Sequence, residues 1–548
     1  MQAVITALVL LLAVLICGIA ARLSPLKIPL PILQIVAGVL LSVAARLQVP
    51  LEPEIFFLLF IPPLLFLDGW RIPKGALFGD WRPILTLAVG LVACTVLGVG
   101  WLIAALIPAV PLTVAFALAA ILSPTDPVAV SAILRGVPIP PRLMHILEGE
   151  ALLNDASGLV CFRFAVGAAL TGAFSLTQAS GSFLLTAAGG LAAGAAIAWA
   201  ASALYHLLTR HRGEESGSQI LISILIPFAA YLAAEHVRAS GILAAASAGV
   251  SMHYADLMTR SLGETRMRRS AVWDMLQTSL NGIIFVLLGL QLPGIISQMP
   301  SIAKSAGVGG SSWLIVYIVV ITAALWCVRF GWTVVSLLVM RFFAWRRAEP
   351  RTFPGLLLPC VAAFAGVRGA VTLAGILTLP FVMSDGSPFP ARDLAIFIAT
   401  GVILLWLIVA SMVLPVLAVR LPYTEGMLPA SQEAAARSAA AEAAIRRVEE
   451  VRDQASADTR DTHAEAAARV VDVYRRRVEY GGTGDEAERN VRVRQAERRL
   501  RAVGARAERD EYHRLRLSRQ IDDSIYQKLL RELDVLEATP PPPPQNPV

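Results

Sequence analysis

The sequence has little of what an enzyme or a metal-binding protein requires. Its 548 residues contain no phosphate-binding loop, no nucleophile and base arrangement, and no closely spaced group of histidines and cysteines. The five cysteines lie far apart within apolar runs, so we expect them to pack rather than to form disulfides or bind metal. They are Cys17, Cys94, Cys161, Cys327 and Cys360. These absences argue against enzymatic activity.

Charged residues are also scarce, at 16% of the chain, whereas hydrophobic residues make up 56%. Soluble proteins are about 45–50% apolar, so this composition predicts a membrane protein with several spans. The N-terminal apolar run has no basic region before it and no convincing A-x-A cleavage site before the next span. We therefore expect residues 3–20 to form a retained first helix rather than a signal peptide.

Thirteen apolar segments, each near the length that crosses a bilayer, follow one another up to residue 420. Their approximate ranges are 2–22, 28–47, 54–70, 83–107, 112–134, 142–171, 182–208, 218–236, 240–254, 272–297, 313–343, 354–380 and 391–420. The loops after odd-numbered segments carry most of the basic residues, so the positive-inside rule predicts an external N-terminus and a cytoplasmic C-terminus. We expect an all-α polytopic membrane protein.

The composition changes after residue 420, where alanine, glutamate, arginine and aspartate dominate at helical spacing. This change predicts a transmembrane domain at 1–420 and a cytoplasmic helical tail at 421–548. We expect Gly481, Gly482 and Gly484 to divide the tail and its proline-rich end to be extended or disordered. A regulatory or dimer-stabilising tail and a plain solvated appendage both fit. The excess of basic residues lies in the membrane part, so the net charge of +7 indicates no nucleic-acid partner.

Residues 121–160 place carboxylates in sequence that otherwise indicates membrane-buried helix. The polar residues concerned are Asp126, Glu148, Glu150, Asn154 and Asp155. A charged side chain at the centre of the bilayer costs roughly 2.5–3.5 kcal/mol on insertion scales, so it needs a partner or a function. An ion site is one interpretation, and a set of internal salt bridges that fix helix packing is the other.

Two segments carry signals for a broken helix. Pro124 and Pro127 bracket Thr125 and Asp126, and each proline removes a backbone donor and disfavours helical geometry at the residue before it. The fifth span should therefore open there and free its carbonyl groups towards protein or a wet cavity. A structural helix with a proline kink is the alternative.

The twelfth span has a second candidate break, because glycines surround Arg368 in the run AFAGVRGAVTLAG. Spans five and twelve run in opposite directions, since their order differs by an odd number. This is the pattern of an inverted-topology repeat whose discontinuous helices cross near the midplane. Glycine-mediated helix packing is the alternative interpretation of this run.

Oxygen ligands suit a small hard cation such as Na⁺. Asp155, Asp126, Thr125 and the freed carbonyl groups could supply them, while Asn154 either binds the cation or braces the open span. A protonated carboxyl group and a cation-bound carboxylate both carry little net charge, whereas the empty carboxylate is costly to move. Asn154, next to Asp155, is an amide and not a second carboxylate, so only one charge of this pair can titrate. We therefore expect one cation to exchange for one proton at Asp155.

Two arginines lie deep inside predicted spans and need partners. We expect Arg329 to pair with Glu150 and Arg368 to lie near the ends of the opened helices. Asp68 stands close to the cytoplasmic end of the third span. It is either part of an inner funnel or an ordinary helix-end carboxylate near Arg71.

Five motifs in this order resemble the sodium/proton exchanger family of monovalent cation/proton antiporters, in its bacterial branch. They are PPLLF at 62–66, SPTDPVAV at 123–130, EGEALLNDASGLV at 148–160, CVRFGW around Arg329, and GVRGAVTLA at 366–374. The resemblance implies a homodimer of thirteen-helix protomers, each with a dimerisation domain and a core domain that carries the ion by an elevator-like movement. It implies Asp155 as the cation and proton site, with Thr125 and Asp126 on the crossing helix. Asn154 is the partner typical of electroneutral exchangers, and Glu150 with Arg329 is a structural ion pair.

The chain departs from the family pattern at two positions. Ala151 stands where the family often has serine, which leaves the preference between Na⁺ and K⁺ open, and Leu67 separates the first motif from Asp68. The expected function is exchange of cytoplasmic Na⁺, Li⁺ or K⁺ for external H⁺ across the bacterial inner membrane, with no cofactor. K⁺/H⁺ exchange is an alternative, and so is a cation channel or sensor, although no repeated filter loop is present.

Overall fold

The computed structural model describes residues 2–23, 28–47, 49, 53–134, 137, 139–172, 176–209, 216–258, 263–305, 307, 310–346, 355–383, 385–421, 427–454 and 460–479, with short stretches between 504 and 533. The chain separates into two compact units, Met1–Tyr423 and Thr424–Val548. Within the described residues the regular elements are helices, and the only β pairing is a single bridge between Val382 and Pro388. The expected all-α class is confirmed.

Each predicted span coincides with one helix or with consecutive helices of the first unit. The bounds are α1 Gln2–Leu23, α2 Leu30–Ala44, α3 Pro53–Arg71, α4 Lys74–Gly79, α5 Trp81–Leu85, η1 Thr86–Leu91, α6 Val92–Leu106, α7 Leu112–Ile121, α8 Pro127–Ile133, α9 Pro141–Thr171, α10 Leu176–Thr209, α11 Ser216–His236, α12 Gly241–Met258, α13 Gly263–Ser297, α14 Met299–Ser305, α15 Ser311–Arg346, α16 Leu357–Phe364, α17 Ala370–Leu377 and α18 Arg392–Ala418. Of the helices described, eight are long and apolar enough to cross a membrane. The protein is therefore a multi-pass membrane protein, and the count of thirteen spans stays a prediction.

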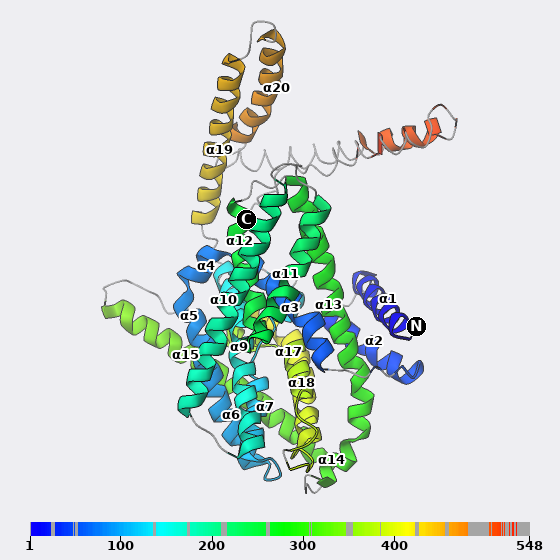
Figure 1. Cartoon of the computed structure of the whole chain (residues 1–548), viewed down its shortest axis with the longest axis vertical. Helices are drawn as coiled ribbons and strands as arrows, with labels where there is room; N and C mark the ends of the chain where they lie inside the picture. Colours follow the sequence, from blue (N-terminus) through cyan, green and yellow to red (C-terminus); the bar gives the residue numbers. More distant parts are fainter. Residues whose placement is uncertain are drawn as a thin grey trace. The chain divides into compact units, whose positions relative to one another are not determined.

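Helices α1, α2, α3 and α10 to α13 form the first helix set. Helices α10, α11 and α12 lie side by side (Figure 1), and α3 packs on α12 while α13 packs on α2. The α2 and α13 backbones approach closely, since a methyl group at Gly38 would lie 2.1 Å from the carbonyl oxygen of Val286. Small residues allow such close packing where helices meet in a membrane.

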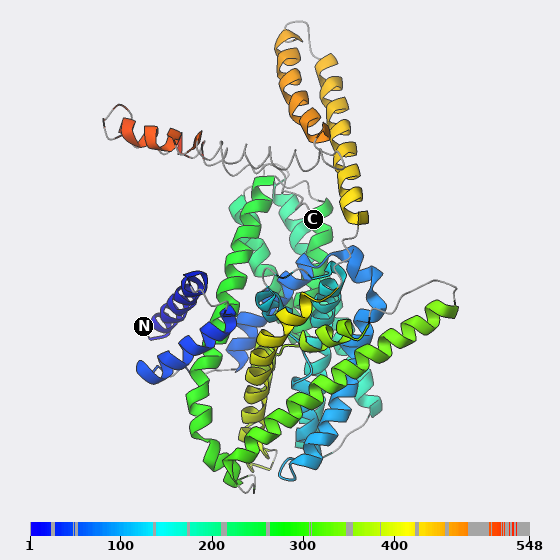
Figure 2. The same cartoon turned by 180° about the vertical axis from the view of Figure 1, so that it is seen from behind.

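Helices α5 to α9, together with η1 and α15 to α18, form the second helix set. Figure 2 shows the long yellow-green α15 running obliquely across this part of the molecule, and it contacts α6, α16 and α18. The two sets meet through a small group of helices, with α3 on α9 and α17, α12 on α9, α13 on α17, and α2 on α8. The breaks between α7 and α8 and between α16 and α17 both belong to the second set.

The second unit contains α19 Met427–Asp453 and α20 Arg460–Glu479, which pack against each other. Ala441 of α19 and Ala467 and Val471 of α20 are buried, while most other described side chains of the pair are exposed. The sequence thus predicted helices here correctly. The glycines at 481, 482 and 484 and the proline-rich end lie outside the described residues.

Candidate ion-binding site

The fifth span is broken where the prolines predict it. Helix α7 ends at Ile121 and α8 begins at Pro127, with non-helical backbone at residues 123–126. Asp126 has an extended backbone and caps α8, because its Oδ1 accepts hydrogen bonds from the amides of Val128 (2.9 Å) and Ala129 (3.2 Å). A capping carboxylate satisfies amides that would otherwise lack partners at a helix start.

The twelfth span is broken as well, between α16 and α17. The two breaks touch, since the Asp126 amide donates a hydrogen bond of 2.8 Å to the carbonyl oxygen of Val367. A methyl group on Gly369 would lie 2.2 Å from Oδ2 of Asp126, so the absence of a side chain at Gly369 permits this approach. Asp126 therefore lies between the starts of α8 and α17, where the helix dipoles favour a negative charge. The expected discontinuous crossing helices are present, and the inverted repeat stays a prediction.

Asn154 braces the opened fifth span. Its Nδ2 donates to Oγ1 of Thr125 at 2.9 Å and lies 3.5 Å from Oε1 of Glu150 on the preceding turn. All three side chains are buried. The amide oxygen Oδ1 of Asn154 has no hydrogen-bond partner in the part of the chain that the structure describes. Of the two roles open to Asn154, the structure shows the bracing contact.

Glu150 and Arg329 form a buried ion pair between α9 and α15. Both carboxylate oxygens of Glu150 bind the guanidinium group, and the contact from Nη2 to Oε2 measures 2.7 Å. The side chains are 1% and 3% exposed. The Nε of Arg329 also donates to the Ala362 carbonyl at 2.9 Å, so this one arginine ties α15 to α9 and to α16. Such a bidentate pair compensates two charges that burial alone would make costly.

Arg368 lies in the break of the twelfth span, as expected from its place among the glycines. It is buried, donates to the Gly366 carbonyl at 2.5 Å, and stands 4.6 Å from the centre of the Trp406 ring. The Trp406 indole in turn donates to the Phe364 carbonyl at 3.3 Å. The guanidinium group is therefore stabilised by a carbonyl dipole and an aromatic face at the end of α16.

Asp155 differs from Asp126 and Glu150, whose carboxylates are bound by other groups of the protein. It is buried on α9, and none of the described residues donates a hydrogen bond to its carboxyl group or forms an ion pair with it. It lines a cavity of about 50 Å³ together with Thr125, Asp126 and Ala151. Asp155 thus combines burial, access to a small cavity and freedom from internal partners.

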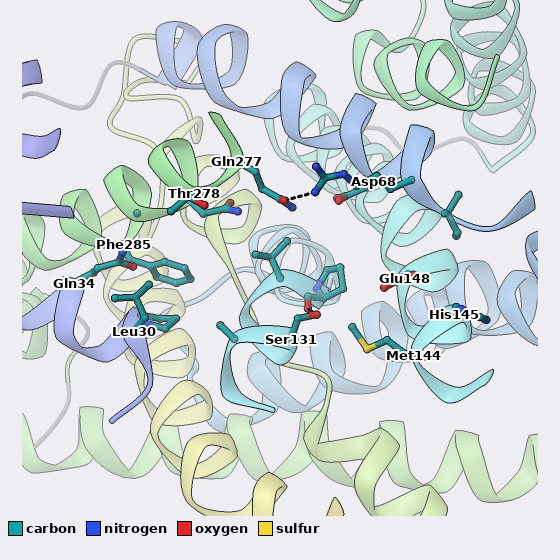
Figure 3. A pocket seen from close by; sticks show the side chains of 18 of the residues that line it. Leu30, Gln34, Asp68, Ser131, Met144, His145, Glu148, Gln277, Thr278 and Phe285 are labelled. Atoms are coloured by element: carbon teal, nitrogen blue, oxygen red, sulfur yellow. Dashed lines mark hydrogen bonds between the residues drawn. The ribbon is translucent and has the colours of Figure 1, made fainter. Parts of the chain in front are cut away.

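A wider cavity of about 800 Å³ adjoins the small one (Figure 3). We call the wide cavity the funnel. The two share Asp68, Pro127, Val128 and Asn281 in their walls, so the cavity beside Asp155 adjoins the funnel. Met144, His145 and Glu148 of α9 line the funnel on one side, and Gln34, Gln277, Thr278 and Phe285 line it on another.

Asp68 lies at the neck between the two cavities, as the funnel interpretation predicts. Its neighbour Arg71 bonds elsewhere, donating to Asp274 at 2.5 Å and to Gln277 at 2.8 Å. The bond to Gln277 is the dashed line in Figure 3. Arg71 therefore pairs with α13 rather than serving as the ion-pair partner of Asp68.

Two polar residues of the site were missed in the sequence. Asn281 of α13 lines both cavities, and Thr372 of α17 lines the small one. The available signal for Asn281 was an amide side chain four residues after Gln277, directly before the apolar run at 282–290. Thr372 follows Arg368 by four residues within a motif that already indicated the break.

Two broken helices cross beside a buried carboxylate that no described residue binds, and this is the architecture of a secondary ion transporter. Residues 11–420 match the family model described as sodium/hydrogen exchanger, transmembrane, and the chain belongs to this family. It is therefore an antiporter for monovalent cations and protons, and not an enzyme.

Curated relatives cover almost the whole chain. It is 41% identical to the uncharacterized Na⁺/H⁺ exchanger YjcE of Escherichia coli (strain K12), over 98% of this chain and 99% of that one. It is 38% identical to the sodium, potassium, lithium and rubidium/H⁺ antiporter of Bacillus subtilis (strain 168), over 98% of this chain and 79% of that one. The fold is similar to that of the sodium proton antiporter MjNhaP1 of Methanocaldococcus jannaschii, with a TM-score of 0.53 and 18% sequence identity. The match covers 77% of this chain and 99% of that one.

Proposed function

We propose that this antiporter exchanges cytoplasmic Na⁺, with Li⁺ and K⁺ as further candidates, for external H⁺ at a single carboxyl group, that of Asp155. The observation that carries the proposal is the free state of Asp155, a buried carboxyl group with no described internal partner beside a cavity that adjoins the funnel. A proton and a cation would compete for the same oxygens.

The neighbouring carboxylates support a single exchanging charge. Glu150 is held by Arg329 through both oxygens, and one oxygen of Asp126 accepts two amides at the start of α8. Asp68 belongs to α3 in the first helix set and lies at the neck, where it can attract cations without travelling with Asp155. One cation would then replace one proton, and transport would be electroneutral.

The residues around Asp155 supply oxygen ligands for Na⁺. Thr125 offers a hydroxyl oxygen with a lone pair beyond the one that accepts from Asn154, and the break in the fifth span leaves carbonyl groups without helical partners. Asp126 is already committed as a cap through Oδ1. Its main contribution is therefore to hold the two helix starts together and to add negative charge near the cation.

The small contact between the helix sets supports an elevator-like movement. Every residue proposed to hold the ion belongs to the second set, whereas α3, α2, α12 and α13 of the first set form the surface opposite it. Movement of the second set would carry Asp155 past that surface. The protonated and the cation-bound forms of the Asp155 carboxyl group carry little net charge. They would therefore cross the apolar contact at a much lower free-energy cost than the empty, charged carboxylate.

The funnel is proposed to open to the cytoplasm. Arg71 lines it, and the loop that follows α3 is among the basic ones that the positive-inside rule assigns to the cytoplasm. This orientation places the N-terminus outside and α19 and α20 inside the cell. A homodimer in the bacterial inner membrane, driven by inward proton flow, completes the proposal.

K⁺/H⁺ exchange is the second candidate. The Bacillus subtilis relative is named for potassium and rubidium as well as sodium and lithium. In this chain Ala151 puts a methyl group, rather than an oxygen ligand, in the cavity wall. A site with few fixed oxygen ligands discriminates less against a larger cation.

The test is proton flux in proteoliposomes, driven in turn by Na⁺, Li⁺ and K⁺, with the membrane potential clamped at several values. We expect flux that requires the cation, ignores the potential and disappears in Asp155→Asn. Flux that follows the potential would overturn the electroneutral mechanism, and robust exchange by Asp155→Asn would remove Asp155 from its role.

A further inference from the structure

Thr372 carries a buried hydroxyl group for which the described residues supply no partner. The side chain is 1% exposed, and its Oγ1 has no hydrogen-bond partner among the residues that the structure describes. Buried hydroxyl groups are nearly always hydrogen-bonded, so an exception at the edge of a cavity points to a missing ligand. Thr372 lines the same small cavity as Asp155, Thr125 and Asp126.

The helix break explains why this hydroxyl is free. Threonines inside the intact helices donate to the carbonyl four residues earlier, at 2.7 Å for Thr322, 2.8 Å for Thr333 and 2.8 Å for Thr400. The residue four positions before Thr372 is Arg368, which lies in the non-helical segment before α17. Its carbonyl is therefore not in the helical position that such a bond requires, and Oγ1 stays available.

Two other side chains of the cavity wall already accept hydrogen bonds through an oxygen atom. Thr125 accepts from Asn154, and Asp126 accepts two amides through Oδ1. The wall at Ala151 presents a methyl group. A hard cation that sheds water on entering a cavity of about 50 Å³ needs further oxygen atoms, and Thr372 carries an unused one.

We propose that Thr372 is a cation ligand, whose hydroxyl oxygen binds the transported ion together with Asp155. The inference rests on the proposed function and deepens it by naming a residue that sets cation affinity. The position is well defined, because Gly369, which lies against Asp126, directly precedes α17 and stands three residues before Thr372. The start of α17 repels a cation through its dipole, and a hydroxyl oxygen with free lone pairs offsets that repulsion.

The proposal separates cation binding from proton binding. The proton needs only the Asp155 carboxyl group, whereas the cation needs the hydroxyl as well. Removing the hydroxyl should therefore raise KM for the cation and leave the maximal exchange rate and its dependence on proton concentration nearly unchanged. A purely structural role for Thr372 would lower the amount of folded protein or the maximal rate instead.

The variants are compared in proteoliposomes by KM for Na⁺ and Li⁺, maximal rate and pH profile. Thr372→Val keeps the shape and removes the oxygen, and we expect KM to rise about tenfold, the effect of losing about 1.4 kcal/mol of binding. Thr372→Ser keeps the hydroxyl and should stay much closer to the native KM. Thr378→Val is the matched control, because the Thr378 hydroxyl donates to the Gly375 carbonyl at 2.6 Å and lies outside the cavity wall.

A second substitution tests whether a hydroxyl group elsewhere in the cavity restores KM. Ala151 faces the same cavity, so Ala151→Ser in the Thr372→Val background supplies a new hydroxyl and should bring KM back towards the native value. If Thr372→Val is not recovered as folded protein, Thr372→Ala replaces it in the same comparison.

An unchanged KM in both the valine and the alanine variants would overturn the proposal, as would a valine variant that loses maximal rate alone. These results leave the proposed function standing, provided that Asp155→Asn abolishes exchange. Failure of the native protein to exchange cations for protons is the separate result that removes the proposed function itself.

Discussion

The buried pair of Glu150 and Arg329 makes a quantitative prediction about stability. In Arg329→Met the Glu150 carboxylate loses both guanidinium contacts and keeps only the Asn154 amide at 3.5 Å, while the Ala362 carbonyl loses a donor. Breaking a buried pair by removing one partner costs roughly 3–5 kcal/mol. In a domain of 150–250 residues, each kcal/mol of lost stability lowers the melting temperature by about 2–4 °C, and in a larger domain by less. We therefore expect the melting temperature to fall by about 5–10 °C.

The assay is the melting temperature of the purified protein in detergent. It is determined from the fraction of protein that stays monodisperse after heating to each temperature. Arg163 and Glu235 provide a matched control, because this pair is 3.6 Å long and its side chains are 60% and 35% exposed. Arg163→Met should cost less than about 1 kcal/mol, as exposed pairs do. The double variant Glu150→Gln with Arg329→Met should recover most of the loss, since no unpaired charge stays buried. A single variant as stable as the native protein would refute the reasoning.

Three further predictions concern the site. Asp155→Asn should abolish cation-dependent proton flux and leave the melting temperature nearly unchanged, because no described internal bond depends on its charge; a large loss of stability would contradict this. Gly369→Ala should lower exchange at least tenfold, since its methyl group would lie 2.2 Å from Oδ2 of Asp126 and must push the two breaks apart; native flux would show that the contact is not needed. Asn281→Leu should lower the maximal rate by narrowing the neck between the cavities, and an unchanged rate would exclude this route for the ion.

The funnel gives the site a defined approach. Asp68 and Glu148 in its wall favour a cation over an anion, and the shared wall residues lead from the funnel to Asp155. The paired Arg71 turns its charge towards Asp274 and Gln277, which lessens the repulsion that a free guanidinium group would exert on an arriving cation. The route therefore matches the charge of the ion that the family exchanges.

Local patterns in the sequence were sufficient for much of the fold. The helix break at Thr125 and Asp126 follows from the geometry that Pro124 and Pro127 impose on their own neighbours. The long apolar runs predict membrane helices because each span must satisfy its own backbone hydrogen bonds in lipid. Glu150 and Arg329 were expected to pair because a buried charge requires a partner of opposite sign.

The choice among partners depended on packing between helices far apart in the chain. Only the tertiary structure shows that Asp126 caps α8 and touches Gly369, and that Arg71 bonds to Asp274 and not to Asp68. It also shows that no described residue binds the Asp155 carboxyl group. Thr372 and Asn281 became site residues for the same reason. A sequence determines the backbone geometry over one or two helical turns, and it shows which buried charges need a partner. The packing of the helices decides which groups become those partners and which groups are left to bind the ion.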